Sequence, residues 1–416
     1  MSFRLLHTSD WHLGHTLHDV ARVYEFECFF TWLLDTLEAE RIDALVIAGD
    51  IFDVANPSAA AQQLWYRFLS RARQRFPQLD IVAIAGNHDS ASRLEAPRAL
   101  LEELNIQVIG WLPREESGAL DLHRLLVSLH DDSGDIAAWC AAVPFLRPAD
   151  LPRQQDSKDP LIDGVRQVYG EVLQAAAARC APNQALIATG HCYMTASKIS
   201  DLSERKILGG NEHALPADIF PSEVSYVALG HLHLAQEVAE QRHIRYCGSP
   251  IPLSMSEIDY PHQVCVATFE GQELVALETP LVPRSIDLLR IPATGPKEKQ
   301  EVLAELRNLP DYDDEAGTPA PFLEVRIRLE KPESGLRSEV AQALEGKNVR
   351  FVKLSLETTG TGGTLRDVVA HQRPEDLKPE EVFRSLYQSK HQGEPPTDVM
   401  DCFYEILELA EGGEGQ

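Results

Sequence analysis

Residues 44–53, Ala-Leu-Val-Ile-Ala-Gly-Asp-Ile-Phe-Asp, carry the clearest signal for the fold of this chain. The apolar run Ala44–Ala48 is too short for a buried helix and favours a buried strand. Gly49 ends this run, and the carboxylates of Asp50 and Asp53 follow within four residues. A short apolar strand that leads directly into acidic side chains predicts an α/β sheet with a ligand site at its strand ends.

Four other short apolar runs end in the same way. Arg4–Thr8 leads into Asp10-Trp11-His12, Ile81–Ala85 into Gly86-Asn87-His88-Asp89, Ala185–Thr189 into Gly190-His191, and Tyr226–Leu229 into Gly230-His231-Leu232-His233. Three of the five predicted strands, Arg4–Thr8, Ala44–Ala48 and Ile81–Ala85, alternate with helical patterns, which indicates βαβ units. We therefore expect five loops to converge at one site. A glycine precedes the ligand in four of these loops and permits close approach of the backbone.

The polar side chains of these loops favour two bound cations over one. They are two Asp, one Asn and four His residues: Asp10, His12, Asp50, Asn87, His191, His231 and His233. This set exceeds what a single ion takes from protein, but it suits two ions that share a bridging carboxylate. Carboxylate and imidazole donors without thiolate favour Mn, Fe, Zn or Mg. Two such ions, about 3.5–4 Å apart, stabilise in-line displacement at phosphorus.

Length and charge limit the possible functions. The chain has 416 residues, which predicts two or three domains, and its 44% of hydrophobic residues exclude global disorder. It has 38 Lys and Arg against 64 Asp and Glu, for a net charge of −26. Neither residues 1–280 nor residues 281–416 are basic, so a stand-alone nucleic-acid binder is not indicated. For a polyanionic substrate, bound cations or a partner would have to supply positive charge.

The sequence predicts a cytoplasmic protein. Its apolar runs are all shorter than the roughly 20 residues of a membrane span, and Met1–Leu6 lack the apolar core of a signal peptide. The seven cysteines are odd in number, scattered and without a C-x-x-C pair, which indicates reduced thiols.

The patterning along the chain divides it into four segments. Residues 1–280 form the α/β unit, with helices predicted over 22–40, over 57–76 (with Asn56 as N-cap) and over 165–177. Residues 281–358 show a βαβαβ pattern typical of a small α+β domain. Residues 359–373 resemble a linker, and residues 374–416 contain two amphipathic helical segments, Pro379–Ser389 and Thr397–Leu409.

The order D-x-H, G-D-x-x-D, G-N-H-D, G-H, G-H-x-H resembles the calcineurin-like metallophosphoesterase superfamily. Within it, the chain is similar to the D subunits of bacterial SbcCD nucleases at His7–Gly14, Ala48–Asp53, Ala85–Ser90, Ala228–His233 and Tyr246–Leu253. The resemblance spans essentially the whole chain. It implies a core of two sheets flanked by helices, a small βαβαβ capping domain and a C-terminal helical tail.

The same resemblance implies a role for each site residue. One ion would be held by Asp10, His12 and His233, the other by Asn87, His191 and His231, with Asp50 bridging them. His88 matches the catalytic histidine, which stabilises the transition state or protonates the leaving 3′ oxygen. Asp53 matches the position that orients this histidine. We interpret Asp89 as a residue that either supports the metal ligands from behind or stabilises the fold.

The activity implied by the resemblance is manganese-dependent cleavage of DNA in repair and recombination. It combines 3′–5′ exonuclease action on duplex ends with endonuclease action on hairpins. The implied partner is an SbcC-type, SMC-like ATPase, which could supply the missing phosphate-binding surface. A homodimer within a heterotetramer is implied as well, with the tail helices docking to the ATPase.

Two alternative functions stay open at the level of sequence. A phosphatase or small-molecule phosphodiesterase would use the same metal core, but Val54 follows Asp53 where Ser/Thr phosphatases carry a phosphate-binding Arg. A non-catalytic scaffold is disfavoured by the complete ligand set. We interpret the helical stripe Arg67, Arg71 and Arg75 as a solvated face, with DNA or partner contact as the alternative. We interpret His15 and His18 as solvated loop residues, with an approach to the substrate as the alternative.

Overall fold

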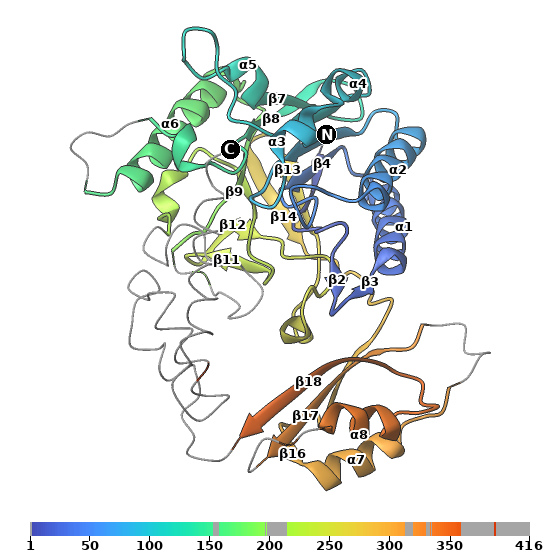
Figure 1. The fold of residues 1–416 in the computed structure, drawn as a ribbon. Helices are drawn as coiled ribbons and strands as arrows, with labels where there is room; N and C mark the ends of the chain where they lie inside the picture. The colour runs from blue at the N-terminus through green and yellow to red at the C-terminus, as the bar shows by residue number, and fades with distance from the viewer. Residues whose placement is uncertain are drawn as a thin grey trace.

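The computed structural model describes residues 2–152, 158–195, 214–312, 319–329 and 335–358, together with residues 197, 333 and 387. The predicted linker and tail helices lie outside these ranges, apart from residue 387. The described chain forms a larger unit of two sheets flanked by helices, with a smaller unit beside it (Figure 1). The calcineurin-like α/β class predicted from the sequence is thereby confirmed.

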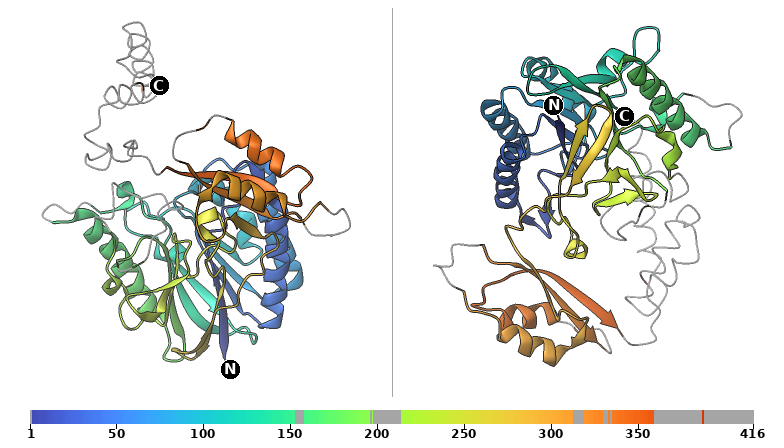
Figure 2. Two further views of the ribbon diagram at one scale, coloured as in Figure 1. Left: turned by 90° about the horizontal axis from the view of Figure 1, so that it is seen from below. Right: turned by 180° about the vertical axis from the view of Figure 1, so that it is seen from behind.

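The first sheet contains the strands that carry the first three motifs. Its order is β14 (Glu273–Glu278), β13 (Cys265–Glu270), β1 (Phe3–Thr8), β4 (Ala44–Ala48), β5 (Asp80–Ile84) and β6 (Ile106–Ile109). The last four strands are parallel, and β13 is antiparallel to β1. The helices α1 (Val23–Ala39) and α2 (Ala59–Arg75) cover its outer face (Figures 1 and 2).

The second sheet carries the two glycine-histidine motifs. Its order is β11 (Gln236–Val238), β12 (Gln241–Tyr246), β10 (Tyr226–Gly230), β9 (Ala185–His191), β8 (Ile136–Ala142) and β7 (Leu126–His130). The four strands β8, β9, β10 and β12 are parallel. Helix α6 (Pro160–Arg179) covers its outer face (Figure 1), and one apolar core joins the inner faces of both sheets.

The smaller unit has a parallel sheet centred on β17 (Phe322–Leu329). On one side β17 pairs with β15 (Leu288–Ile291) and β16 (Lys297–Glu298), and on the other with β18 (Arg350–Thr358). Helices α7 (Lys299–Arg307) and α8 (Leu336–Ala343) cover the face turned away from the larger unit (Figures 1 and 2). The other face packs Phe322 and Val352 against Leu17 and Met255 of the larger unit.

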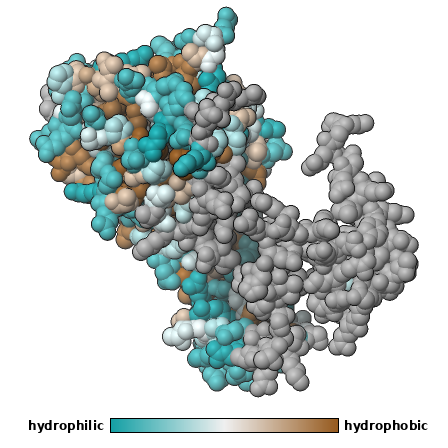
Figure 3. Space-filling view, turned by 90° about the vertical axis from the view of Figure 1, so that its left-hand side faces the viewer, coloured by the Kyte–Doolittle hydropathy of each residue, from teal (hydrophilic) through white to brown (hydrophobic). Residues whose placement is uncertain are grey.

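Leu17 belongs to a short hairpin, and the remaining elements are small connectors. They are β2 (Thr16–Leu17), β3 (Val20–Ala21), α3 (Ala91–Glu95), α4 (Arg98–Glu102), α5 (Leu122–Leu125), and the 3₁₀ turns η1 (Pro148–Asp150), η3 (Ala217–Ile219) and η4 (Met255–Glu257). None of the helices within the described ranges is both long and apolar enough to cross a membrane. On the face drawn in Figure 3, hydrophobic residues are scattered among hydrophilic ones over the larger unit.

The start of α2 corrects one prediction. Asn56 does not cap this helix, because the Oγ of Ser58 accepts a hydrogen bond from Ala61 N at 3.2 Å and makes Ser58 the N-cap. On the same helix, Arg67 pairs with Glu27 at 2.9 Å and Arg75 with Asp35 at 2.7 Å. These two arginines therefore lie in exposed ion pairs with α1.

Candidate metal centre

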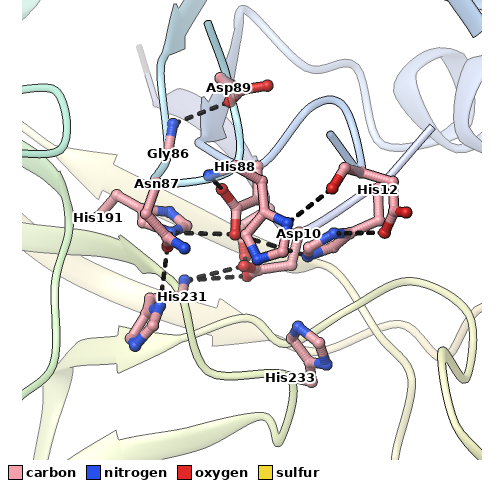
Figure 4. A network of polar contacts seen from close by, with 12 residues as sticks. Asp10, His12, Gly86, Asn87, His88, Asp89, His191, His231 and His233 are labelled. Atoms are coloured by element: carbon pink, nitrogen blue, oxygen red, sulfur yellow. Dashed lines mark hydrogen bonds and ion pairs between the residues drawn. The ribbon is translucent and has the colours of Figure 1, made fainter. Parts of the chain in front are cut away.

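The five strand-end loops converge on one buried cluster (Figure 4). Asp10 and His12 follow β1, Asp50 follows β4, Asn87 follows β5, His191 ends β9, and His231 and His233 follow β10. Apart from the half-buried Asn87, these side chains are buried. Three groups have ligand atoms within 4.8 Å of one another: Asp10, His12 and His233; His12, Asp50 and His88; and Asp10, Asp50 and His191.

Asp50 lies between the two halves of this cluster. Its Oδ2 is 3.5 Å from His12 Nε2 and 3.3 Å from His191 Nε2, so one carboxylate oxygen faces a histidine on each side. Its Oδ1 accepts a hydrogen bond from His88 N at 2.9 Å. On the His191 side, Asn87 Oδ1 lies 3.0 Å from His191 Nε2 and 3.2 Å from His231 Nδ1. The candidate ligand atoms of Asn87, His191 and His231 therefore lie close to one another.

Backbone strain marks the same residues. Asp10, His12 and Asp50 have φ values of 54°, 47° and 49°, and His231 has a φ of 107°. Residues with a side chain rarely adopt this left-handed region, and each such residue costs on the order of 1–3 kcal/mol. Four strained residues in one cluster indicate a site in which function sets the backbone geometry.

Two glycines make the convergence possible. A Cβ on Gly86 would lie 2.1 Å from Asp50 Oδ1, and a Cβ on Gly230 would lie 1.9 Å from the carbonyl oxygen of Ala48. Both distances are shorter than any real contact, so these loops approach closely only because glycine lacks a side chain.

His191 and His12 each place Nδ1 against an oxygen acceptor, which leaves Nε2 as the nitrogen for a cation. His191 Nδ1 donates to the carbonyl of Ala48 at 2.9 Å, which directs Nε2 into the cluster. His12 Nδ1 lies 3.3 Å from Asp53 Oδ1, and the buried His12 Nε2 has no hydrogen-bond partner among the described residues. A buried nitrogen aimed at carboxylates without a partner fits a metal ligand.

Charge in the cluster also fits a divalent cation. Burial alone would lower the pKa of His191, but the charge and hydrogen bond of Asp50 raise it to about 9. Burial and the neighbouring His191 instead lower the pKa of His231 to about 3. A cation among these donors would take the place of the proton on His191 and bind neutral imidazoles. The donor set therefore suits divalent metal binding.

His88 is held by the main chain of Asp53. Its Nδ1 donates to the main-chain carbonyl of Asp53 at 2.7 Å, while the Asp53 carboxylate contacts His12 Nδ1 at 3.3 Å and His15 Nδ1 at 3.2 Å. The backbone of Asp53, and not its carboxylate, thus contacts the histidine. Because a carbonyl only accepts, Nδ1 carries the proton, and Nε2 is the nitrogen left to face a substrate.

Asp89 connects two of the loops that carry the candidate ligands. Its carboxylate accepts hydrogen bonds from the backbone N–H groups of Ile51, Phe52 and Gly86 at 3.1, 2.9 and 2.9 Å. It therefore ties the loop after β4 to the loop after β5. Burial and the nearby charge of Asp50 raise its pKa to about 6.

Sequence reasoning missed Glu257. Its Oε1 lies 3.0 Å from His233 Nδ1, and both side chains are buried. Burial would raise the pKa of Glu257, but His233 holds it at about 2. This carboxylate orients His233 as second-layer acids do for metal-binding histidines. The sequence gave no sign of this role, because Glu257 lies in the short turn η4 between two strands and outside all five ligand motifs.

The interpretation of His15 as a solvated residue is wrong. Its side chain is only 21% exposed, and its Nε2 lies 2.8 Å from the carbonyl of Leu253 while its Nδ1 contacts Asp53. The ring bridges the first motif loop and the segment before η4. A loop position in the sequence gave no sign of this packing.

Comparison with known families agrees with this site. Residues 3–235 match the calcineurin-like phosphoesterase family, and residues 284–391 match the type 5 capsule protein repressor C-terminal domain. The chain belongs to the calcineurin-like phosphoesterases.

Its curated relatives narrow this class. It is 39% identical over 392 residues to the D subunit of the SbcCD nuclease from Rhodobacter capsulatus, an alignment that covers 92% of this chain and 94% of the relative. It is 31% identical to the D subunit of the SbcCD nuclease from Escherichia coli K12, over 91% of each chain. The Bacillus subtilis protein of that name is 33% identical over 63% of this chain and 65% of its own length. Within its family, the chain is a member of the group formed by the D subunits of SbcCD nucleases.

Proposed function

We propose that this protein is the nuclease subunit of an SbcCD-type complex and hydrolyses DNA phosphodiesters with two divalent cations, Mn²⁺ being preferred. The observation that carries the proposal is the convergence of the seven candidate ligands, six of them buried, with His88 beside them and held by a main-chain carbonyl. The names of the relatives support DNA as the substrate.

In this proposal the chain's own residues divide the work. Asp10, His12 and His233 hold one cation, Asn87, His191 and His231 hold the other, and Asp50 bridges them. The cations, when bound, polarise the phosphate and offset its charge. In its doubly protonated form His88 keeps the Nδ1 proton on the carbonyl of Asp53 and uses the second proton, on Nε2, for a hydrogen bond to the phosphate or for transfer to the leaving 3′ oxygen. Asp53 fixes His88 through its carbonyl and His12 through its carboxylate.

The finer activities belong to the same proposal. We infer 3′–5′ exonuclease action on duplex ends and endonuclease action on hairpins, within a heterotetramer of two copies of this chain and two of an SbcC-type ATPase. The net charge of −26 supports a requirement for a partner, because the chain by itself offers DNA little positive surface.

The proposed domain arrangement follows from the same resemblance. Residues 1–280 form the nuclease domain, residues 281–358 cap the active site, residues 359–373 form a linker, and residues 374–416 dock the ATPase.

Truncation after Gly363 should abolish co-purification with the ATPase, and retained binding would contradict the docking role. A monomer in light scattering at micromolar concentration would contradict the dimer.

The decisive experiment is digestion of an end-labelled linear duplex in Mn²⁺, with wild type and His88→Ala compared, each alone and with the ATPase. We expect cleavage by wild type and a loss of at least about a hundredfold in the variant, with Mn²⁺ binding retained. Absence of DNA cleavage under every condition, together with turnover of a small phosphate ester, would favour the phosphodiesterase alternative.

A further inference from the structure

A row of aromatic and cationic side chains leads outward from the metal centre. The ring of Phe145 lies 6.3 Å from the ring of His191, edge to face at 85°. The guanidinium carbon of Arg147 lies 5.8 Å from the centre of the Phe145 ring and 5.8 Å from the centre of the Trp111 ring. Both distances suit cation–π contacts. We call Phe145, Arg147 and Trp111 the rim row.

The rim row is fixed by the main chain on both sides. Phe145 N donates to the carbonyl of Ala85 at 2.9 Å, directly before the Gly86-Asn87 loop. Trp111 N donates to Glu95 Oε1 at 3.1 Å, and Arg147 N donates to Asp150 at 2.8 Å. Its backbone is therefore positioned before any ligand arrives, which lowers the entropy cost of binding.

The outer end of the row is open to a ligand. Trp111 is 46% exposed, although a side chain of this size is normally well buried. Among the described residues, the guanidinium of Arg147 has no carboxylate within ion-pairing distance. In a chain with 64 acidic residues, such an arginine is available to an anion from outside.

We propose that the rim row binds one unpaired nucleotide of the DNA strand whose neighbouring phosphodiester occupies the metal centre. The base stacks on the exposed face of Trp111, and Arg147, held between two rings, contacts the backbone phosphate. A base inside a duplex has both faces covered by its neighbours, so only a frayed, looped or single-stranded base can stack in this way. The rim row thus favours DNA ends and loops over continuous duplex. This inference rests on the proposed function.

The test compares DNA affinity in full-length variants. Fluorescence anisotropy would measure the Kd for an oligothymidylate and for a blunt duplex of equal length, in Mn²⁺ and in a His88→Ala background that blocks cleavage. Trp111→Ala should weaken binding of the single strand by about tenfold, equivalent to about 1.4 kcal/mol, and leave duplex affinity nearly unchanged. Trp111→Phe should retain most of the affinity. Arg147→Gln should weaken both ligands and reduce the slope of log Kd against log salt by about one.

Two controls separate stacking from general damage. Tyr24→Ala removes an aromatic side chain of similar exposure, 47%, and should change neither Kd. An oligonucleotide of abasic sugar-phosphate should bind Trp111→Ala and the unsubstituted background equally well, because no base is present to stack. Titration calorimetry should give the same Mn²⁺ affinity for Trp111→Ala and for the unsubstituted background.

Each other outcome identifies which idea fails. Unchanged affinity of Trp111→Ala for the single strand, or equal loss for the duplex, overturns the stacking site while the nuclease proposal stands. Loss of ATPase assembly with unchanged DNA affinity makes Trp111 a protein contact and also overturns it. Wild type that neither binds nor cleaves DNA, alone or with the ATPase, contradicts the nuclease proposal and the rim row together.

Discussion

Glu257→Gln tests whether a residue that contacts a candidate metal ligand from behind sets the affinity of the site for Mn²⁺. Both carboxylate oxygens of Glu257 accept buried donors: Oε1 lies 3.0 Å from His233 Nδ1, and Oε2 accepts from Leu253 N at 2.8 Å. Glutamine has the same shape but only one acceptor oxygen, so one donor loses its partner. If the amide NH₂ faces His233, it forces the proton onto Nε2, which is the nitrogen that a cation requires.

The expected magnitude follows from these two contacts. An unsatisfied buried donor costs about 1–3 kcal/mol, and loss of an outer-layer partner lowers metal affinity by about 10- to 100-fold. We therefore expect a free energy of unfolding reduced by about 1–3 kcal/mol without metal. Mn²⁺ affinity should be about 10- to 100-fold weaker at the half formed by Asp10, His12 and His233.

Titration calorimetry with Mn²⁺ measures the affinities, and urea unfolding in EDTA measures the stability. Glu237→Gln is the matched control, because Glu237 pairs with Arg245 at 3.3 Å, is 44% exposed at its side chain and does not contact the cluster. The reasoning is refuted if Glu257→Gln binds Mn²⁺ with the affinities of wild type. A stability loss alone would leave Glu257 as a packing residue.

Further predictions concern the loops and the core. Gly86→Ala would place a Cβ 2.1 Å from a carboxylate oxygen of the cluster, so calorimetry should show at least about tenfold weaker Mn²⁺ binding. Gly170→Ala, inside α6 where an added Cβ meets nothing, should be neutral or stabilising by about 0.5–1 kcal/mol. Burial and, secondarily, Arg245 lower the pKa of His7 from 6.5 to about 3, so between these values the unfolded chain binds a proton that the folded chain excludes. His7 therefore leaves the free energy of unfolding unchanged above pH 6.5 and lowers it as the pH falls toward 3. In urea unfolding, His7→Gln should reduce the dependence of this free energy on pH by about 1.4 kcal/mol per pH unit between about pH 4.5 and 6. Asp53→Asn keeps the carbonyl that holds His88 but weakens the acceptor for His12. The affinity for Mn²⁺ should therefore fall by a larger factor than the single-turnover rate at saturating metal. A rate that falls more than the affinity would contradict these separate roles.

Local sequence patterns were enough to predict the strands and the polar groups at their ends. Short apolar runs such as Ala44–Ala48 are local signals, because burial on both faces needs no knowledge of distant residues. The glycines before Asp50 and Asn87 indicated close approach for the same reason. The run Tyr226–Leu229 likewise predicted β10, which extends from Tyr226 to Gly230.

The pairing of the polar groups, in contrast, depends on the tertiary structure. The contact of His88 with the carbonyl of Asp53 joins residues 35 positions apart, and that of Glu257 with His233 joins residues 24 positions apart. Such pairs depend on where separate loops cross and on left-handed φ values at Asp10 and Asp50, which no periodicity encodes. The rim row has the same origin, because Trp111 and Arg147 meet only where the ends of two different sheets come together.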